Sequence, residues 1–201
     1  MQMQLTDIKL EGWCSPEKEK WLTDWIEARR PKLIVEIGVY GGASLIPMAV
    51  AAASYPSRVY GIDPWEIAAC LEGMVDRTSV EWWTHPNQIP LSKLENDCRK
   101  AVRDLNLTNV QFLKGHSDLF ADAFDDNSID LLSIDGNHGP QALIDGQNYL
   151  RKVKRGGLIA CDDEDWTEGG VKTVRLLVKW LLKNGCKSRG TITDCAMIQK
   201  L

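Results

Sequence analysis

The sequence has no long apolar run, because nowhere do about 18 consecutive apolar residues occur. A membrane-spanning helix is therefore not expected. The first twenty residues also lack a basic stretch followed by an apolar one, so they do not resemble a secretory signal. We expect a cytoplasmic protein with no membrane partner.

Paired cysteine motifs are absent as well. The six cysteines contain no C-x-x-C pair, and this argues against both a thiolate zinc site and a disulfide framework. They are spread along the chain as Cys14, Cys70, Cys98, Cys161, Cys186 and Cys195. We interpret them as reduced thiols, in keeping with a cytoplasmic location.

The sequence also has no excess of positive charge. It contains 24 Lys and Arg and 28 Asp and Glu, which gives a net charge of −4. The one basic cluster, Lys152, Lys154 and Arg155, is short and is interpreted as a helix C-terminus, where cations complement the dipole. A nucleic acid partner is not expected. A chain of 201 residues with 44% hydrophobic and 26% charged residues predicts one globular domain over residues 1–201.

Short β-branched runs alternate with longer helical patterns, and this alternation predicts an α/β fold with a mostly parallel sheet. The N-terminal segment, residues 1–31, is expected to contain a helix from Pro16 to Arg29. Strands are expected at 33–37, 59–62, 110–113, 129–134 and 157–161, with helices at 140–153 and 171–183 and a hairpin that turns near 191–194.

Residues 64–108 break this rhythm, because the stretch is much longer than one strand-to-strand crossover needs. Its middle, EWWTHPNQIP, carries two prolines and two adjacent tryptophans. Long connections in compact domains are more often functional than accidental, so we predict a lid-like insertion. Packing against a neighbouring subunit in a homo-oligomer would also explain the aromatic residues.

The glycine-rich turn Glu36-Ile-Gly-Val-Tyr-Gly-Gly-Ala-Ser44 follows the first strand and precedes a helix, which predicts a ligand at this point. A nicotinamide-binding turn would read G-x-G-x-x-G, whereas here Glu36 stands two positions before the first glycine. A carboxylate there would repel a pyrophosphate but can pair with an ammonium group. The amino acid end of S-adenosylmethionine carries such a group.

This turn resembles the first motif of the class I S-adenosylmethionine-dependent methyltransferases, and EIGVYGGAS is most similar to the metal-dependent catechol-type O-methyltransferases. The resemblance implies a Rossmann-like, seven-stranded sheet with a C-terminal antiparallel hairpin. It also implies that Tyr40 and Ser44 contact the cofactor beside Gly38 and Gly42.

Further cofactor contacts are predicted at the ends of the next strands. Asp63 ends the second strand and is placed to bind ribose hydroxyls. Trp65 could stack on the adenine, although ordinary packing is an equal alternative. After the third strand comes Gly-His-Ser-Asp, and the resemblance implies that Ser117 holds the adenine edge.

Carboxylates gather where the fourth and fifth strands end, at Asp135, Asp162 and Asp163. Neighbouring parallel strands lie about 5 Å apart, so Asp135 and Asp162 could share one divalent ion, and oxygen ligands suit Mg²⁺. The resemblance implies the same three aspartates as metal ligands. Capping of the following turn is the alternative for Asp162 and Asp163.

His138 follows Asp135 in a D-G-x-H turn, a motif of stand-alone methyltransferases that act on small molecules. We predict catalytic roles for His138, as the base that accepts a hydroxyl proton, and for Asp135, which also joins the cofactor-binding set. A turn histidine, or one that contacts the cofactor, is the alternative. The predicted activity is S-adenosylmethionine-dependent O-methylation of a sugar, phenol or natural product, assisted by a divalent metal. The alternatives are metal-independent N- or O-methylation, a nicotinamide oxidoreductase, and a non-catalytic cofactor-binding scaffold.

Overall fold

The computed structural model describes residues 3–201, so the first two residues of the expected N-terminal segment lie outside the described part. A short 3-10 helix, η1 (Leu5–Asp7), precedes helix α1 (Pro16–Arg29). Ser15 caps α1, because its Oγ accepts a hydrogen bond from the backbone N–H of Lys18 at 3.1 Å. Pro16 at the first helical position costs no hydrogen bond. The expected start and end of this helix are confirmed.

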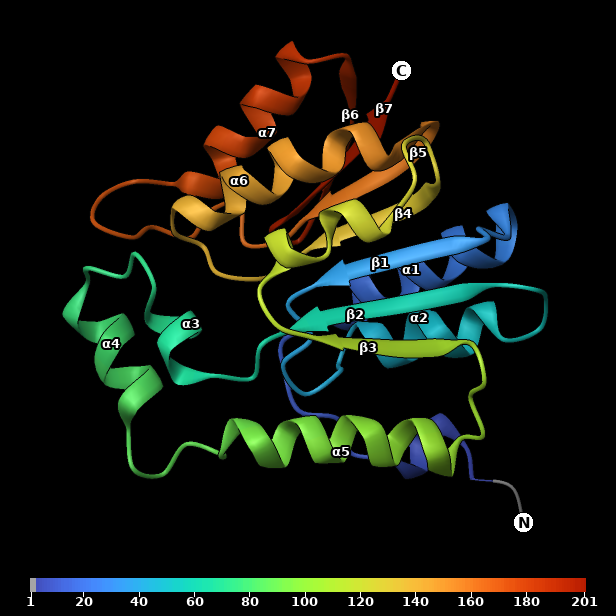
Figure 1. Ribbon diagram of the computed structural model, residues 1–201, viewed down its shortest axis with the longest axis horizontal. Coiled ribbons are helices and arrows are strands. Elements are labelled where there is room, and N and C mark those ends of the chain that lie inside the picture. The colour runs from blue at the N-terminus through green and yellow to red at the C-terminus, as the bar shows by residue number, and fades with distance from the viewer. Residues whose placement is uncertain (1–2) are drawn as a thin grey trace.

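One sheet of seven strands has the order β3-β2-β1-β4-β5-β7-β6 (Figure 1). The first five of these pair in parallel, and β7 and β6 add an antiparallel hairpin at the edge. The predicted class I methyltransferase sheet is confirmed. The strands are β1 (Leu33–Ile37), β2 (Arg58–Asp63), β3 (Val110–Lys114), β4 (Ile129–Ile134), β5 (Val153–Cys161), β6 (Cys186–Ile192) and β7 (Cys195–Lys200).

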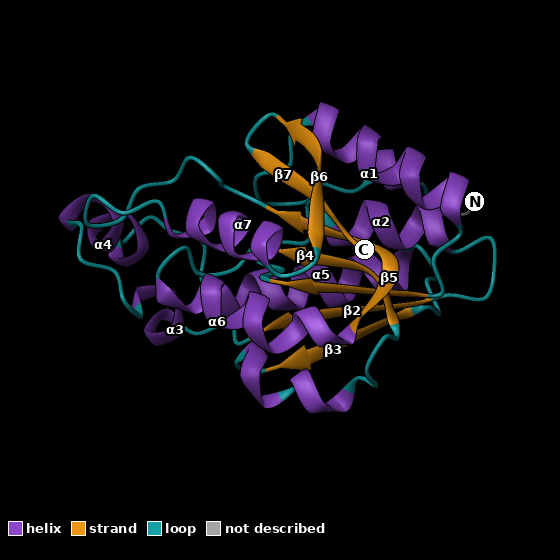
Figure 2. Cartoon of the chain, turned by 90° about the horizontal axis from the view of Figure 1, so that it is seen from above, coloured by secondary structure: helices purple, strands orange, loops and turns teal. Residues whose placement is uncertain are grey.

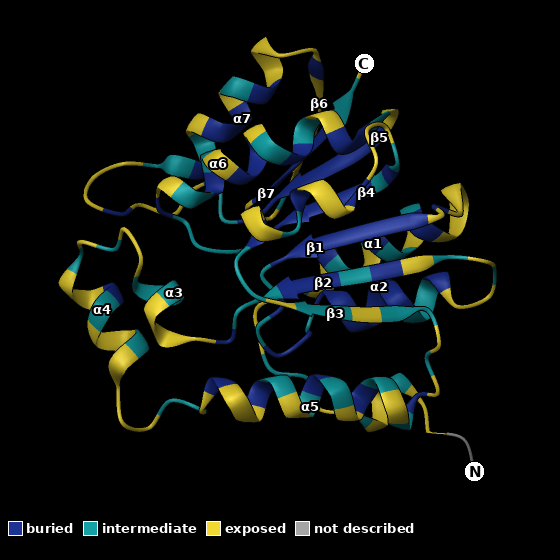
Figure 3. Cartoon of the chain, in the orientation of Figure 1, coloured by how far each residue is buried: buried dark blue, intermediate teal, exposed yellow. Residues whose placement is uncertain are grey.

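Helices cover both faces of the sheet (Figure 2). On one face α1, α2 (Leu45–Ala52) and α5 (Leu91–Asp104) form one apolar cluster with the sheet, and on the other face α6 (Pro140–Tyr149) and α7 (Thr173–Lys183) form a second. Strand β1 is buried along its whole length (Figure 3), as a central parallel strand should be. Within residues 3–201, no helix combines the length and apolarity needed to cross a bilayer.

Residues 64–108 contain three helices, of which only α5 belongs to the core, through Leu94 and Cys98. The other two, α3 (Ile67–Leu71) and α4 (Arg77–Thr84), lie beyond the carboxyl ends of the parallel strands (Figure 1). Glu168 ties this part to the loop before α7. Its carboxylate accepts hydrogen bonds from the N–H groups of Val75 and Asp76, at 2.7 and 2.5 Å, and from the hydroxyl of Ser79 at 2.9 Å.

The fifth strand starts earlier than the sequence indicates, at Val153 rather than Gly157. Accordingly α6 stops at Tyr149, and a 3-10 turn, η4 (Leu150–Lys152), fills the gap. Gly156, with φ of 81°, allows the strand to continue through an irregular register with β4. Two further 3-10 turns, η2 (Ser117–Leu119) and η3 (Ala121–Ala123), follow β3.

Candidate active site

The turn after β1 brings the carboxyl ends of the central strands together. Gly38 has φ of 85°, and a Cβ atom there would lie 2.1 Å from the carbonyl oxygen of Asp135. Only glycine fits this conformation and this close approach. Its N–H donates to the carbonyl of Ile62 at 2.9 Å, and the N–H of Asp135 donates to that of Ile37 at 2.8 Å. The turn is therefore fixed to both neighbouring strands.

Glu36 lies directly below this turn and is completely buried. Neither carboxylate oxygen has a hydrogen-bond partner among the described residues. Burial raises the pKa of Glu36 to about 7, although the nearby hydroxyl of Ser44 and the charge of Lys18 oppose the shift. An unpartnered buried carboxylate favours a positively charged ligand group, because such a group would repay its desolvation. The ammonium of S-adenosylmethionine fits this requirement.

Asp63, at the end of β2, holds the glycine turn from the other side. Its carboxylate accepts the backbone N–H groups of Val39 and Tyr40, both at 2.9 Å, and that of Trp65 at 2.6 Å. Tyr40 and Trp65 both have left-handed backbone angles, with φ of 49° and 47°. These hydrogen bonds stabilise that strained turn. Burial nevertheless raises the pKa of Asp63.

A cleft of about 1120 Å³, which includes space open to solvent, lies above the strand ends. Eight of the predicted site residues line it, namely Gly38, Tyr40, Ser44, Asp63, Ser117, Asp135, His138 and Asp163. The structure thus brings together residues at the ends of five different strands, as expected for a ligand crevice at the switch point of a parallel sheet.

Three predicted cofactor contacts, Glu36, Gly42 and Trp65, do not line the cleft, and the last two have identifiable packing roles. Trp65 is 4% exposed and packed against Phe112 edge-on, with ring centres 5.8 Å apart. Its Nε1 donates to the carbonyl of Tyr40 at 2.8 Å, so the indole supports the turn instead of facing an adenine. A Cβ atom at Gly42 would lie 3.0 Å from the side chain of Ile46 and 3.2 Å from Sγ of Cys98. Gly42 therefore serves close packing of α2 under the turn.

Ser117 meets a residue that the sequence analysis missed. Its hydroxyl donates to Oδ1 of Asp145 at 2.5 Å, and Nε2 of Gln141 donates to the same oxygen at 2.9 Å. Asp145 is 1% exposed, yet it contributes to the cleft wall, and burial raises its pKa to about 6. The available signal was an aspartate on the buried side of α6, three residues after Ala142 and one before Gly146.

Aromatic rings from three segments meet at the cleft. Trp13, Tyr40 and Trp83 all line it. The ring centres of Trp13 and Tyr40 are 5.1 Å apart, and those of Tyr40 and Trp83 are 6.1 Å apart. Such rings offer flat apolar surface to an organic ligand. Trp83 comes from the expected lid, whereas Trp13 was not predicted.

His138 and Asp163 form a pair at the cleft wall. Nε2 of His138 lies 2.8 Å from Oδ2 of Asp163, a close contact in which the ring nitrogen is not aligned for a hydrogen bond. Burial opposes the ionisation of Asp163, but the contact with His138 outweighs it and lowers the pKa of this carboxyl. Asp163 has a left-handed φ of 58°, which lets the second aspartate of the Asp-Asp pair turn away from the first.

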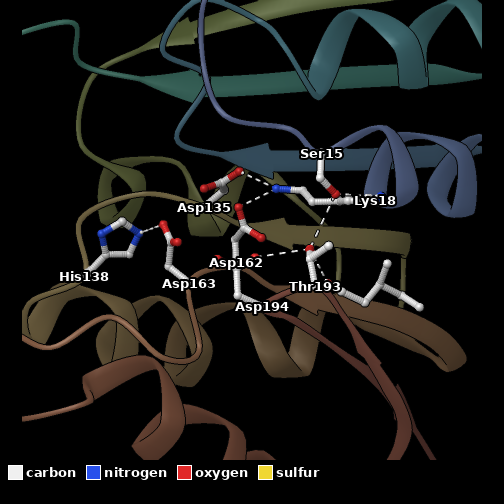
Figure 4. A network of polar contacts seen from close by, with 9 residues as sticks. Ser15, Lys18, Asp135, His138, Asp162, Asp163, Thr193 and Asp194 are labelled. Atoms are coloured by element: carbon white, nitrogen blue, oxygen red, sulfur yellow. Dashed lines mark hydrogen bonds and ion pairs between the residues drawn. The ribbon is translucent and has the colours of Figure 1, made fainter.

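Lys18, on α1, is the most unexpected member of the site (Figure 4). Its ammonium lies 3.1 Å from Oδ2 of Asp135 and also donates to Oδ2 of Asp162. The lysine side chain is only 2% exposed. Burial disfavours its charge, but the two carboxylates outweigh this and hold the pKa of Lys18 above its ordinary value. The sequence gave no signal for this role, because Lys18 is one of several charged residues at the start of α1.

The three aspartates predicted to bind a divalent ion therefore do not point to one common position. Asp162 turns to Lys18, whereas Asp163 turns to His138 (Figure 4). A different group does converge, because ligand atoms of Asp135, His138 and Asp163 all lie within 4.8 Å of one another. The donor set for an ion is thus two carboxylates and one imidazole.

Comparison with known proteins agrees with this geometry. Residues 35–164 match the family model described as "Methyltransferase domain". No curated protein matches the chain. These 130 residues, from 35 through 164, contain the glycine turn, the cleft residues after β2 and β3, and both aspartates of the pair after β5.

Similar solved structures share the fold at low sequence identity. The O-methyltransferase TomG from Streptomyces achromogenes, involved in tomaymycin synthesis and bound to S-adenosylmethionine, is 18% identical, with a TM-score of 0.67 over 94% of this chain and 81% of that one. The Podospora anserina methyltransferase PaMTH1, bound to S-adenosylhomocysteine, is 14% identical, with a TM-score of 0.67 over 94% and 79%. An O-methyltransferase from Bacillus cereus, also bound to S-adenosylhomocysteine, is 16% identical, with a TM-score of 0.64 over 92% and 81%.

The sheet order with its antiparallel hairpin, the glycine turn above a buried glutamate, and a family match over more than half of the residues lead to one assignment. The chain belongs to the methyltransferase domain family and is a class I S-adenosylmethionine-dependent methyltransferase.

Proposed function

We propose that the protein methylates a hydroxyl oxygen of a small molecule. The observation that carries this proposal is the His138–Asp163 pair, which lies in the same cleft as the glycine turn. The bound cofactor supplies an electrophilic methyl group on its sulfonium. A hydroxyl needs to lose its proton to attack such a methyl, and a histidine is the side chain best suited to accept it near neutral pH.

The cofactor-binding residues have separate tasks in this proposal. Glu36 accepts the ammonium from below the turn, while Tyr40 and Ser44 line the space above Gly38. Asp63 contributes to ribose binding. Ser117 holds the adenine edge, and it is oriented by its hydrogen bond to Asp145. Gly42 and Trp65 act indirectly, by keeping the turn in place.

Asp163 orients the base. A carboxylate next to Nε2 of His138 favours the tautomer with the proton on Nε2, so Nδ1 is the atom that accepts the hydroxyl proton. Asp135 belongs to the same wall, where burial and the neighbouring Asp162 raise the pKa of its carboxyl and the ammonium of Lys18 opposes that shift. Much of the rate comes from holding the acceptor oxygen and the methyl group in line.

The acceptor is proposed to be a compact ring compound, such as a phenol, a sugar or another natural product. Trp13, Tyr40 and Trp83 provide a flat apolar wall that suits a ring. We propose α3 and α4, within residues 64–108, as the lid above this wall. A cytoplasmic location fits the six free cysteines, and we propose neither a nucleic acid nor a membrane as partner.

A second candidate is the metal-assisted form of the same reaction, favoured by the convergence of Asp135, His138 and Asp163. A bound Mg²⁺ would lower the pKa of a coordinated hydroxyl. Asp162, the remaining predicted ligand, pairs with the ammonium of Lys18 and would not hold the ion. Since the ion would use His138 as a ligand, this form excludes His138 as the base.

Calorimetry with S-adenosylhomocysteine and a methyl-transfer assay against phenols and sugars test the proposal. We expect one binding site per chain and transfer to oxygen in at least one acceptor class. Assays with EDTA and with added Mg²⁺ separate the two candidate forms. Binding without transfer to any hydroxyl, or transfer to nitrogen alone, would contradict the proposed activity.

A further inference from the structure

The divalent ion was predicted to lie between Asp135 and Asp162. In the structure, a cation of the chain itself, the ammonium of Lys18, occupies that position. The ammonium of Lys18 lies between Asp135 and Asp162, which end the neighbouring strands β4 and β5 (Figure 4). Both carboxylates direct Oδ2 to this one nitrogen. An ion bound between these two oxygens would have to displace a lysine that is 98% buried, since its side chain is 2% exposed.

Local structure does not account for this lysine. Lys18 is the third residue of α1 after the cap Ser15, and cations in the first turn of a helix oppose its dipole. Lys20, on the same helix, is 75% exposed and pairs with Asp24 in solvent. The chain thus places one lysine of α1 against the site at an energetic cost, while a similar one remains outside.

The surroundings of Lys18 hold it in place. The cap hydroxyl of Ser15 fixes its backbone, and the same hydroxyl lies 3.5 Å from Oγ1 of Thr193 in the β6–β7 turn. Asp135, in turn, has its carbonyl pressed against Gly38. The ammonium therefore meets two carboxylates whose backbones are also fixed, and only Asp135 reaches the cleft.

We propose that Lys18 replaces the divalent ion, supplying from within the chain the positive charge that metal-dependent O-methyltransferases take from solution. This inference rests on the proposed function. Lys18 is a positioning residue, because it acts through Asp135 and does not line the cleft. Its charge compensates Asp135 and Asp162, and it leaves His138 with Asp163 free for proton transfer.

Mn²⁺ binding, followed by electron paramagnetic resonance on the full chain, tests this proposal without relying on turnover. We expect no stoichiometric Mn²⁺ site in the wild type. Lys18→Met removes the charge at nearly constant volume, and it should bind Mn²⁺ at least 10-fold more tightly than the wild type. Adding Asp162→Asn should abolish the gained site. Lys20→Met is the matched control and should behave as the wild type.

Turnover completes the test. Wild-type transfer should change less than twofold between EDTA and added Mg²⁺, and Lys18→Met should lose at least 10-fold in kcat. One Mn²⁺ bound per wild-type chain and lost in Asp162→Asn, or turnover that requires a divalent ion, would overturn the proposal. If Lys18→Met fails to fold, Mn²⁺ binding and the EDTA dependence of turnover in the wild type still test the proposal. Failure of the proposed function itself would show differently, as absent transfer with an unchanged Mn²⁺ result.

Discussion

Nε2 of His138 lies 2.8 Å from Oδ2 of Asp163, although the two residues follow different strands of the sheet. The left-handed backbone of Asp163 makes this contact possible, because it turns this carboxylate outward while Asp162 stays inside with Lys18. The two neighbouring aspartates thus serve different partners. Because their partners differ, substitutions at the two sites should have different effects.

Replacement of His138 separates chemistry from cofactor binding. His138→Gln should lower kcat by roughly 100- to 10,000-fold, the usual contribution of a general base. The dissociation constant for S-adenosylhomocysteine should stay within about twofold, since calorimetry reports only the cofactor part of the cleft. His85→Gln, in an exposed histidine after α4, is the control. An unchanged kcat would remove His138 from the mechanism.

Replacement of Glu36 tests the electrostatic basis of cofactor binding. Glu36→Gln keeps the shape but removes the charge, and a lost charge-assisted hydrogen bond costs about 1.5–3 kcal/mol, which corresponds to roughly 10- to 150-fold weaker binding. Calorimetry with S-adenosylhomocysteine measures the effect. The exposed Glu27→Gln, on α1, should bind normally. Equal affinities for both variants would refute the assigned ammonium contact.

The same residue predicts a pH dependence of stability. Burial raises the pKa of Glu36 to about 7, so the folded apo protein holds a proton there that the unfolded chain releases at lower pH. The stabilising contribution is complete below the unfolded value near 4.5 and is lost as the pH rises through about 7. Urea unfolding of wild type and Glu36→Gln should therefore diverge by on the order of 3 kcal/mol between pH 4.5 and 8. Parallel curves would contradict this.

Removal of the Glu168 carboxylate tests the lid. Glu168→Ala leaves the N–H groups of Val75 and Asp76 and the hydroxyl of Ser79 without their acceptor. We expect α4 to loosen, which should raise KM for the acceptor several-fold and speed limited proteolysis within residues 64–90. The exposed Glu66→Ala, in the same segment, is the control. Identical proteolysis of both variants would argue against this anchor.

The fold could be predicted because it depends on local patterns. Five parallel strands, the start and end of α1, and the C-terminal hairpin followed from apolar runs and turn residues. The early start of β5 could not, because Lys154 and Arg155 conceal a strand that continues through an irregular register. Similarly, α5 follows the aromatic stretch directly, and only packing of Leu94 and Cys98 shows that it belongs to the core.

The candidate site was predictable where its residues follow strands. Gly38, Asp63, Ser117, Asp135 and His138 come together because parallel strands end at one edge. Lys18 and Asp145 come instead from helices. Lys18 lies among other charged residues of α1, so nothing distinguishes it, whereas Asp145 is the single charged residue of α6 and its position on the buried side was the available signal. Their partners are distant in sequence, so only the three-dimensional structure could identify them.

The separation of Lys18 from its partners also constrains how the protein matures. The ammonium bonds to Asp135 and Asp162, which lie 117 and 144 positions further along the chain. Loop closure over such distances is slow, so these bonds form after local elements, and the second of them cannot form before Asp162 has been synthesised. Until then the newly made helix α1 keeps its third residue hydrated. Catalytic competence should thus arise in one late step, when the first helix docks against the ends of β4 and β5.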